Sequence, residues 1–115
     1  MTKVAAIQEA LLQAWSIETS SKWLADNPAR GQCGVTALVV QDILGGDIAK
    51  TNVDGAWHFY NLVSGERLDF SASQFAAPIA YSDLPSTRDE AFADTSAAQY
   101  QALCGQIARS GVLER

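Results

Sequence analysis

Basic residues are scarce in this sequence. Eight lysines and arginines stand against thirteen aspartates and glutamates, which gives a net charge of −5. Nucleic acids and anionic membranes bind proteins through clustered Lys and Arg side chains, so this balance disfavours both as main partners. Long apolar runs are also missing, because the longest, around Val35–Val40, is far shorter than the roughly 18 residues of a membrane helix. Residues 1–9 show no apolar block of the kind found in signal peptides, so a cytoplasmic protein is expected.

Cysteine and histidine are scarce as well. The two cysteines are Cys33 and Cys104, and the one histidine is His58. In a cytoplasmic protein two cysteines are expected to be free thiols rather than a disulfide. Any chemistry that pairs a thiol with an imidazole must use His58. A zinc site made of these three residues and Asp69 would lack the usual C-x-x-C spacing, so no metal and no other cofactor is expected.

The composition suits one hydrophobic core. Of the 115 residues, 48% are hydrophobic and 18% are charged, so residues 1–115 are expected to form a single domain. Apolar residues at helical spacing predict a helix over about 4–16 and a buried helix over about 33–44, which Gly45-Gly46 ends. Thr95 is predicted to cap a last helix over about 96–109.

The middle of the chain changes period from helix to strand. Strands over 47–53, 56–63 and 67–70, separated by Asp-Gly and Ser-Gly turns, predict an antiparallel meander over about 47–70. The stretch 76–92 contains prolines and charged residues and is predicted to be mostly loop. The order of helices and strands predicts an α+β fold.

Cys33 directly follows Gly31-Gln32 at the predicted start of the buried helix. The positive end of the helix dipole and the free N–H groups there are expected to lower the pKa of the thiol and to stabilise an oxyanion. The Gln32 side chain could add a further donor, and Arg30 could bind a substrate carboxylate. The alternatives are a packed, unreactive cysteine and a solvated loop arginine.

His58 lies in the second predicted strand. Because side chains alternate along a strand, His58 and Tyr60 share one face, while Trp57 and Asn61 share the other. Trp57 is expected to lie in the core. A structural alternative for His58 is a half-buried histidine bonded to a backbone carbonyl.

The Ser-Gly turn places Asp69 relative to His58. If the turn is a two-residue hairpin loop, Val63 pairs with Glu66 and Tyr60 pairs with Asp69. Asp69 then lies on the His58 face, diagonally across the hairpin, and can accept a hydrogen bond from one ring nitrogen. This leaves the other nitrogen to face Cys33, in the order nucleophile, base and orienting acid. Asn61 competes for the third role, but its face is opposite.

These segments resemble the YunG-like family of small bacterial proteins. The resemblance covers about residues 15–75 and rests on Pro28-Ala29-Arg30-Gly31-Gln32-Cys33-Gly34-Val35-Thr36-Ala37-Leu38-Val39-Val40, Gly45-Gly46, His58-Phe59-Tyr60-Asn61 and Gly65-Glu66-Arg67-Leu68-Asp69-Phe70-Ser71 with Gln74-Phe75. The layout is also similar to the papain-like group, including its transglutaminase-like and cell-wall amidase branches. That similarity implies a cysteine-bearing helix packed on an antiparallel sheet, with Cys33, His58 and Asp69 as the matching positions. The papain-type oxyanion glutamine lies several residues before the cysteine, unlike Gln32.

Two functions are compatible with these observations. One is a papain-like cysteine hydrolase or acyltransferase that acts on an amide or thioester carbonyl of a small molecule or peptide through a triad of Cys33, His58 and Asp69. The other is a non-enzymatic binding or regulatory module that uses the groove between helix and sheet. The sequence specifies neither the substrate nor the oligomeric state, and the reactivity of Cys33 discriminates between the two functions.

Overall fold

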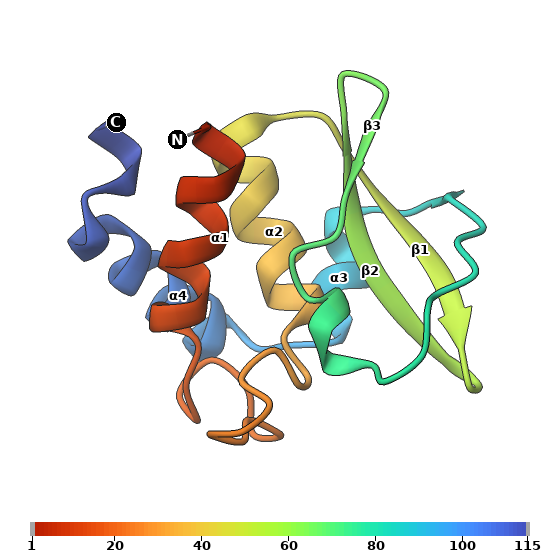
Figure 1. The fold of residues 1–115 in the computed structure, drawn as a ribbon, viewed down its shortest axis with the longest axis horizontal. Helices are drawn as coiled ribbons and strands as arrows, with labels where there is room; N and C mark the ends of the chain where they lie inside the picture. The colour runs from red at the N-terminus through yellow and green to blue at the C-terminus, as the bar shows by residue number, and fades with distance from the viewer. Residues whose placement is uncertain (1, 115) are drawn as a thin grey trace.

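Residues 2–114, which the computed structural model describes, form an α+β fold in which helices pack against a four-stranded antiparallel sheet (Figure 1). The elements in chain order are α1 (Lys3–Ala14), α2 (Cys33–Leu44), β1 (Asp47–Val53), β2 (Ala56–Val63), β3 (Glu66–Leu68), the 3₁₀ turn η1 (Ala72–Gln74), β4 (Leu84–Pro85), α3 (Arg88–Ala93), α4 (Ala97–Ser110) and the 3₁₀ turn η2 (Val112–Glu114). Within this part of the chain no helix is long and apolar enough to span a membrane.

The sheet has the strand order β3-β2-β1-β4. The predicted bounds of β1 and β2 are confirmed. Each strand ends at a tight turn, Asp54-Gly55 or Ser64-Gly65, whose two central residues have positive φ. Val63 pairs with Glu66, so the Ser-Gly loop has two residues, as the hairpin argument required. The third strand is shorter than predicted and ends at Leu68, which pairs with Asn61. Among the described residues, the part of β2 before Asn61 has no paired strand on its β3 side.

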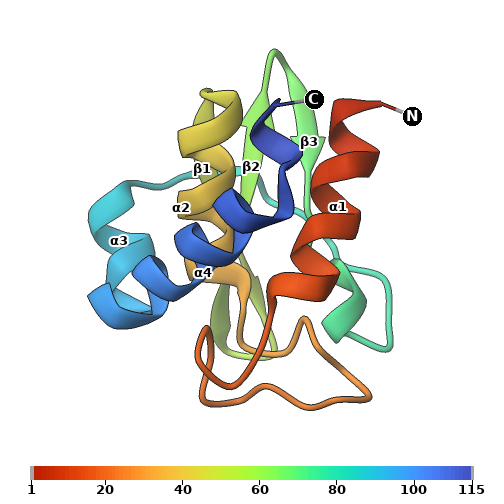
Figure 2. The same ribbon diagram turned by 90° about the vertical axis from the view of Figure 1, so that its left-hand side faces the viewer.

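Helix α2 is the centre of the molecule. Its first eight residues are all buried, and they lie between the sheet and helices α1 and α4 (Figure 2). Two side-chain hydrogen bonds fix the helix in place: the Trp15 indole donates to Thr36 Oγ1 at 2.9 Å, and Asn61 Nδ2 donates to the carbonyl of Ala37 at 3.0 Å. Asn61 therefore faces α2 and not His58, as strand parity predicted.

The segment after the meander differs from the prediction. The stretch 76–92 was expected to be mostly loop, but it contains β4 and most of α3. Thr87 caps α3 by accepting a hydrogen bond from the backbone of Glu90 at 3.2 Å. The spacing of a Thr and a Glu three residues apart is the capping-box signature, so a sequence signal for α3 was present.

Two smaller expectations also change. The last helix is capped by Ser96 rather than Thr95, because the Ser96 hydroxyl accepts from the backbone of Gln99 at 3.1 Å. Trp57 was expected in the core, but 47% of its surface is exposed. It lies near the turn-proximal end of β2, where its ring packs under the Lys50 ammonium at 4.5 Å rather than under a helix.

Candidate active site

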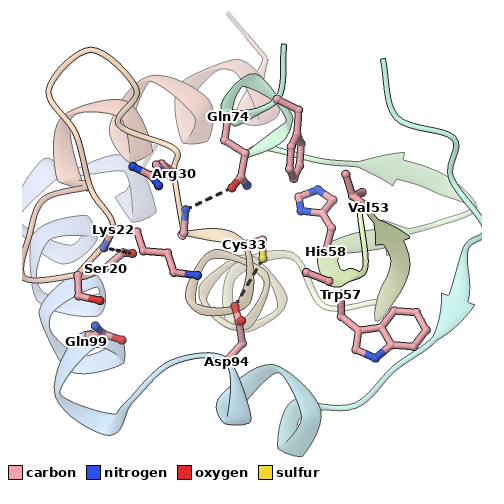
Figure 3. Close-up of a pocket in the computed structure, with 14 residues that line it drawn as sticks. Ser20, Lys22, Arg30, Cys33, Val53, Trp57, His58, Gln74, Asp94 and Gln99 are labelled. Atoms are coloured by element: carbon pink, nitrogen blue, oxygen red, sulfur yellow. Dashed lines mark hydrogen bonds between the residues drawn. The ribbon is translucent and has the colours of Figure 1, made fainter. Parts of the chain in front are cut away.

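A pocket of about 330 Å³ opens at the start of α2 and contains both Cys33 and His58 in its lining (Figure 3). It lies between the chain before α2, the turn-proximal ends of β1 and β2, the η1 segment and the turn that joins α3 to α4. The lining residues are Ser20, Ser21, Lys22, Arg30, Gly31, Cys33, Val53, Ala56, Trp57, His58, Gln74, Phe75, Asp94 and Gln99.

The loop before α2 fixes the position of Cys33 as the first helical residue. Gly31 has φ +73°, a conformation that favours glycine, and a Cβ there would lie 2.4 Å from Ser20 Oγ. Its backbone N–H donates to the Gln74 side chain at 3.2 Å, which ties this loop to η1. Substitution at Gly31 would therefore displace the loop that leads into Cys33.

Asp94 is the hydrogen-bond partner of the Cys33 thiol. The sulfur donates to Asp94 Oδ2 at 3.5 Å, and the backbone N–H of Gly34 donates to the same oxygen at 3.2 Å. Burial and then the negative charge of Asp94 raise the pKa of Cys33 from about 9 to about 12. The expectation of a lowered pKa is therefore wrong, because burial of the thiol, and then the Asp94 carboxylate at the helix N-terminus, outweigh the effect of the helix start.

His58 is bonded as the hairpin register predicted. Its Nε2 lies 2.7 Å from Asp69 Oδ2, and Asp69 also accepts a hydrogen bond from the Tyr81 hydroxyl at 2.8 Å. The imidazole is 1% exposed and meets the edge of the Phe75 ring at 5.0 Å. Its second nitrogen, Nδ1, is buried and has no hydrogen-bond partner among residues 2–114.

Cys33 and His58 reach one pocket from opposite faces of the sheet. Phe59, on the face that packs against α2, belongs to the same buried cluster as Cys33, so the side chain of His58 beside it belongs to the other face. Because β3 ends at Leu68, the edge of β2 is uncovered here, and both side chains line the pocket along that edge. In Figure 3 the Cys33 sulfur is drawn between the Asp94 carboxylate and the His58 ring.

The two residues proposed to contact substrate have different positions. Arg30 is exposed and lies on the pocket lining. Gln32 is fully buried and does not line the pocket. Its Oε1 accepts from the Thr19 hydroxyl at 2.9 Å, and its Nε2 has no partner within the described chain. The Gln32 side chain is thus part of the support beneath Cys33, whereas Arg30 is placed to meet a ligand.

Sequence reasoning missed Asp94 and Tyr81. Asp94 is the C-cap of α3 and lies just after the stretch 76–92 that was predicted to be mostly loop, and no local pattern indicates that its carboxylate reaches α2. Tyr81 precedes β4 in the same segment. Both contacts span more than ten residues of chain and depend on how the segment folds back over the sheet.

Neither a metal centre nor a disulfide is seen in the described part of the chain. Cys33 and Cys104 are free thiols, and residues 2–114 contain no group of three or more His, Cys, Asp or Glu side chains placed to hold a metal ion.

Comparison with known proteins gives one family. The family model described as YunG protein matches residues 3–111. A protein of Bacillus subtilis (strain 168), described as "Uncharacterized protein YunG", is 55% identical over 97 residues, which cover 84% of this chain and 84% of that protein. No solved structure matches the chain.

Proposed function

Because the chain belongs to the YunG family, which brings no described activity with it, we propose its function from the pocket itself: a papain-like cysteine hydrolase or acyltransferase. The proposed triad is Cys33 as nucleophile, His58 as base and Asp69 as orienting acid. The observation that carries the proposal is the buried imidazole that binds Asp69 through Nε2 and keeps Nδ1 unpaired on the pocket shared with Cys33.

The bond pattern of His58 assigns its tautomer. Asp69 accepts, so the proton is placed on Nε2, and the lone pair of Nδ1 is left to accept a proton from a thiol. A buried polar nitrogen without a partner costs free energy, and such atoms occur where a function requires them. The imidazole is thus held in the form that a general base needs before the reaction begins.

The reaction would proceed in two steps. In the first, the Cys33 proton moves to His58 Nδ1, the sulfur bonds to the carbonyl carbon, and the backbone N–H of Cys33 donates to the oxyanion. The C–N or C–S bond to the leaving group then breaks as His58 returns the proton to that group. In the second step water, or another amine or thiol, gives a proton to His58 and attacks the thioester carbon. The C–S bond to Cys33 then breaks, and His58 returns the proton to the sulfur.

One observation favours the alternative, a non-enzymatic binding or regulatory module. The thiol is buried, donates to Asp94, and has its pKa raised to about 12, so almost none of it is thiolate at neutral pH. Under the hydrolase proposal a substrate must draw the sulfur away from Asp94 and toward His58. Under the module proposal Cys33 keeps this bond, and the pocket binds its ligand without covalent chemistry.

Acylation of Cys33 tests the proposal. The protein is incubated at pH 7.5 with a simple activated acyl donor, p-nitrophenyl acetate, and the acylated residue is mapped by mass spectrometry. We expect Cys33 to be acylated and deacylated repeatedly while Cys104 is not, and we expect His58→Gln to abolish the turnover. Asp69→Asn should reduce it less, because it weakens the orientation of the ring without removing it.

A matched control separates chemistry from folding. Cys104→Ala removes the other thiol, which lies half-buried in α4, and should leave the rate unchanged. Urea unfolding of every variant confirms that each is folded under the assay conditions. Acylation of Cys33 that is no faster than that of Cys104, or that is unchanged in His58→Gln, would contradict the hydrolase proposal and favour the binding module.

A further inference from the structure

The charge of the pocket is opposite to the charge of the chain. The whole sequence has eight basic and thirteen acidic residues, yet the pocket lining contains two basic residues, Lys22 and Arg30, and one acidic residue, Asp94. The start of α2 adds the positive end of its dipole to the same space. An acidic protein that gathers Lys22, Arg30 and a helix N-terminus around one pocket has a pocket suited to a negatively charged ligand.

Lys22 and Arg30 are not committed to partners within the protein. Among residues 2–114, neither the Lys22 ammonium nor the Arg30 guanidinium makes an ion pair or a side-chain hydrogen bond. Lys50, Arg67 and Arg88, in contrast, each pair with a carboxylate. Figure 3 shows the Lys22 side chain extending across the pocket toward Cys33 and Asp94.

The structure contains an internal example of a carboxylate at this place. Asp94 Oδ2 receives the N–H of Gly34 at the start of α2, and the Lys22 charge acts on Asp94 through space. The backbone N–H of Gly34 at this helix start can therefore bind a carboxylate oxygen. His58, whose buried Nδ1 has no hydrogen-bond partner among the described residues, lines the same pocket.

We propose that this pocket binds ligands that carry a carboxylate, held by Lys22 and Arg30 beside Cys33. The pocket volume of about 330 Å³ is the volume that roughly eleven water molecules occupy in the liquid. The ligand is therefore a small molecule or the end of a peptide. Where the proposed acyl chemistry holds, on which this part rests, the substrate class is an amide or thioester of an acidic molecule. The anion site itself does not depend on turnover.

The rates of two alkylating reagents measure the charge beside Cys33. Iodoacetate carries a carboxylate and iodoacetamide does not, and both react with the same thiolate. Their rate ratio at one pH therefore cancels the thiolate fraction and reports the local potential. We expect a higher iodoacetate-to-iodoacetamide ratio at Cys33 than at Cys104 of the same molecule, and a ratio that falls as salt is added.

Substitutions show which side chains set the iodoacetate-to-iodoacetamide ratio at Cys33. A unit charge near the sulfur changes the ratio by about fivefold in water-like surroundings, so Lys22→Gln and Arg30→Gln should each lower it by up to that factor. Asp94→Asn should raise it. The matched control is Arg109→Gln, because Arg109 is exposed, also forms no ion pair within the described chain, and follows Gln99 by nearly three turns of α4. Equal ratios at both cysteines, or equal effects of all three cation substitutions, would overturn the proposal.

A second measurement decides the case in which Cys33 reacts with neither reagent. Sodium succinate and neutral succinamide are titrated separately into the Cys33→Ser variant, and backbone amide shifts are followed by NMR. We expect the signals of Gly31 and Gly34 to shift with succinate alone, and Lys22→Gln to remove the shift. Equal responses to both compounds, or none to either, would overturn the anion site.

The two proposals fail separately. The Cys33→Ser variant has no thiol at the proposed nucleophile position, so succinate binding is measured independently of acylation. Succinate binding without acylation of the parent protein would support the anion site and contradict the hydrolase proposal. Acylation of Cys33 together with equal reagent ratios would retain the hydrolase and remove the preference for acidic ligands.

Discussion

Two aspartates flank the pocket and act on its chemistry in opposite directions. Asp69, whose side chain is 5% exposed, accepts from His58 and Tyr81 and leaves the imidazole with one free nitrogen. Asp94, at the end of α3, accepts from the Cys33 thiol and keeps the proton on sulfur. Under the proposed triad, the carboxylate behind the imidazole would prepare the base, whereas the carboxylate beside the thiol would suppress the nucleophile.

The difference follows from which elements carry the two residues. Asp69 continues the β3 chain directly after Leu68, so the hairpin register fixes it relative to His58. Asp94 lies in the short connection between α3 and α4 and is more exposed, which leaves it fewer constraints. A ligand that competes for the Gly34 N–H would therefore move Asp94 at lower cost than Asp69.

Removing the charge of Asp94 should produce the largest effect. In Asp94→Asn the pKa of Cys33 loses its like-charge contribution, which typically amounts to one pKa unit or more, so alkylation by iodoacetamide at pH 8 should accelerate roughly ten- to hundredfold. Asp89→Asn, an exposed carboxylate in the first turn of α3, is the control and should change the rate little. An unchanged or slower rate in Asp94→Asn would show that burial alone suppresses the thiol.

Gly34 is what allows Asp94 to approach α2. A Cβ at this position would lie 2.6 Å from Asp94 Oδ2 and 2.9 Å from the carbonyl of Ala91. Gly34→Ala should therefore displace the end of α3 and lower the free energy of unfolding by about 2 kcal/mol, measured by urea unfolding. Gly105→Ala is the matched helical control, because its nearest contact is the flexible end of Arg109 at 3.3 Å, so it should raise the free energy of unfolding by up to about 1 kcal/mol. Equal changes in the two variants would mean that the close packing of Asp94 is not required.

The two aspartates also differ in how far the sequence could predict them. The pairing of Asp69 with His58 followed from a local register argument, since a two-residue turn and strand alternation determine which side chains share a face. The bounds of β1, β2 and α2 followed in the same way from periodicity and glycine turns. These features depend on neighbours a few residues away.

The contact of Asp94 with α2 could not be predicted in that way. It joins residues 61 positions apart, through a helix, α3, of only six residues. The dipole at the start of α2 predicts a lowered pKa for Cys33, whereas burial of the thiol and then the Asp94 carboxylate, which comes from a distant part of the chain, raise it. Likewise, no local signal separated Gln32, which the core encloses, from Arg30, which reaches the pocket.

The raised pKa of Cys33 makes stability depend on alkaline pH. The unfolded thiol ionises near 9 and the folded thiol near 12, so between these values the folded state binds more protons and stability falls as pH rises. From pH 8 to pH 10 the loss due to Cys33 should be about 1.4 kcal/mol, the equivalent of one pKa unit. Urea unfolding of the parent and of Cys33→Ala at both pH values isolates this contribution, because other titrating groups are common to both. Equal losses in parent and variant would contradict the raised pKa and, with it, the suppressing role assigned to Asp94.

The smallest expected effect lies on the Asp69 side of the comparison. The Tyr81 hydroxyl is the second donor to Asp69 Oδ2, and Oδ1 has no partner among the described residues. Tyr81→Phe keeps the ring contacts but leaves this buried carboxylate with His58 as its one donor, so unfolding should become easier by about 1 kcal/mol. The rate of Cys33 alkylation should stay within about twofold, because Tyr81 acts on the base and not on the thiol. Tyr100→Phe is the matched control: its partner Asp42 is more exposed and keeps its ion pair with Arg88, so the cost there should be smaller. If urea unfolding showed the two variants to be equally stable, Asp69 would not need its second donor, and His58 alone would hold the carboxylate in place.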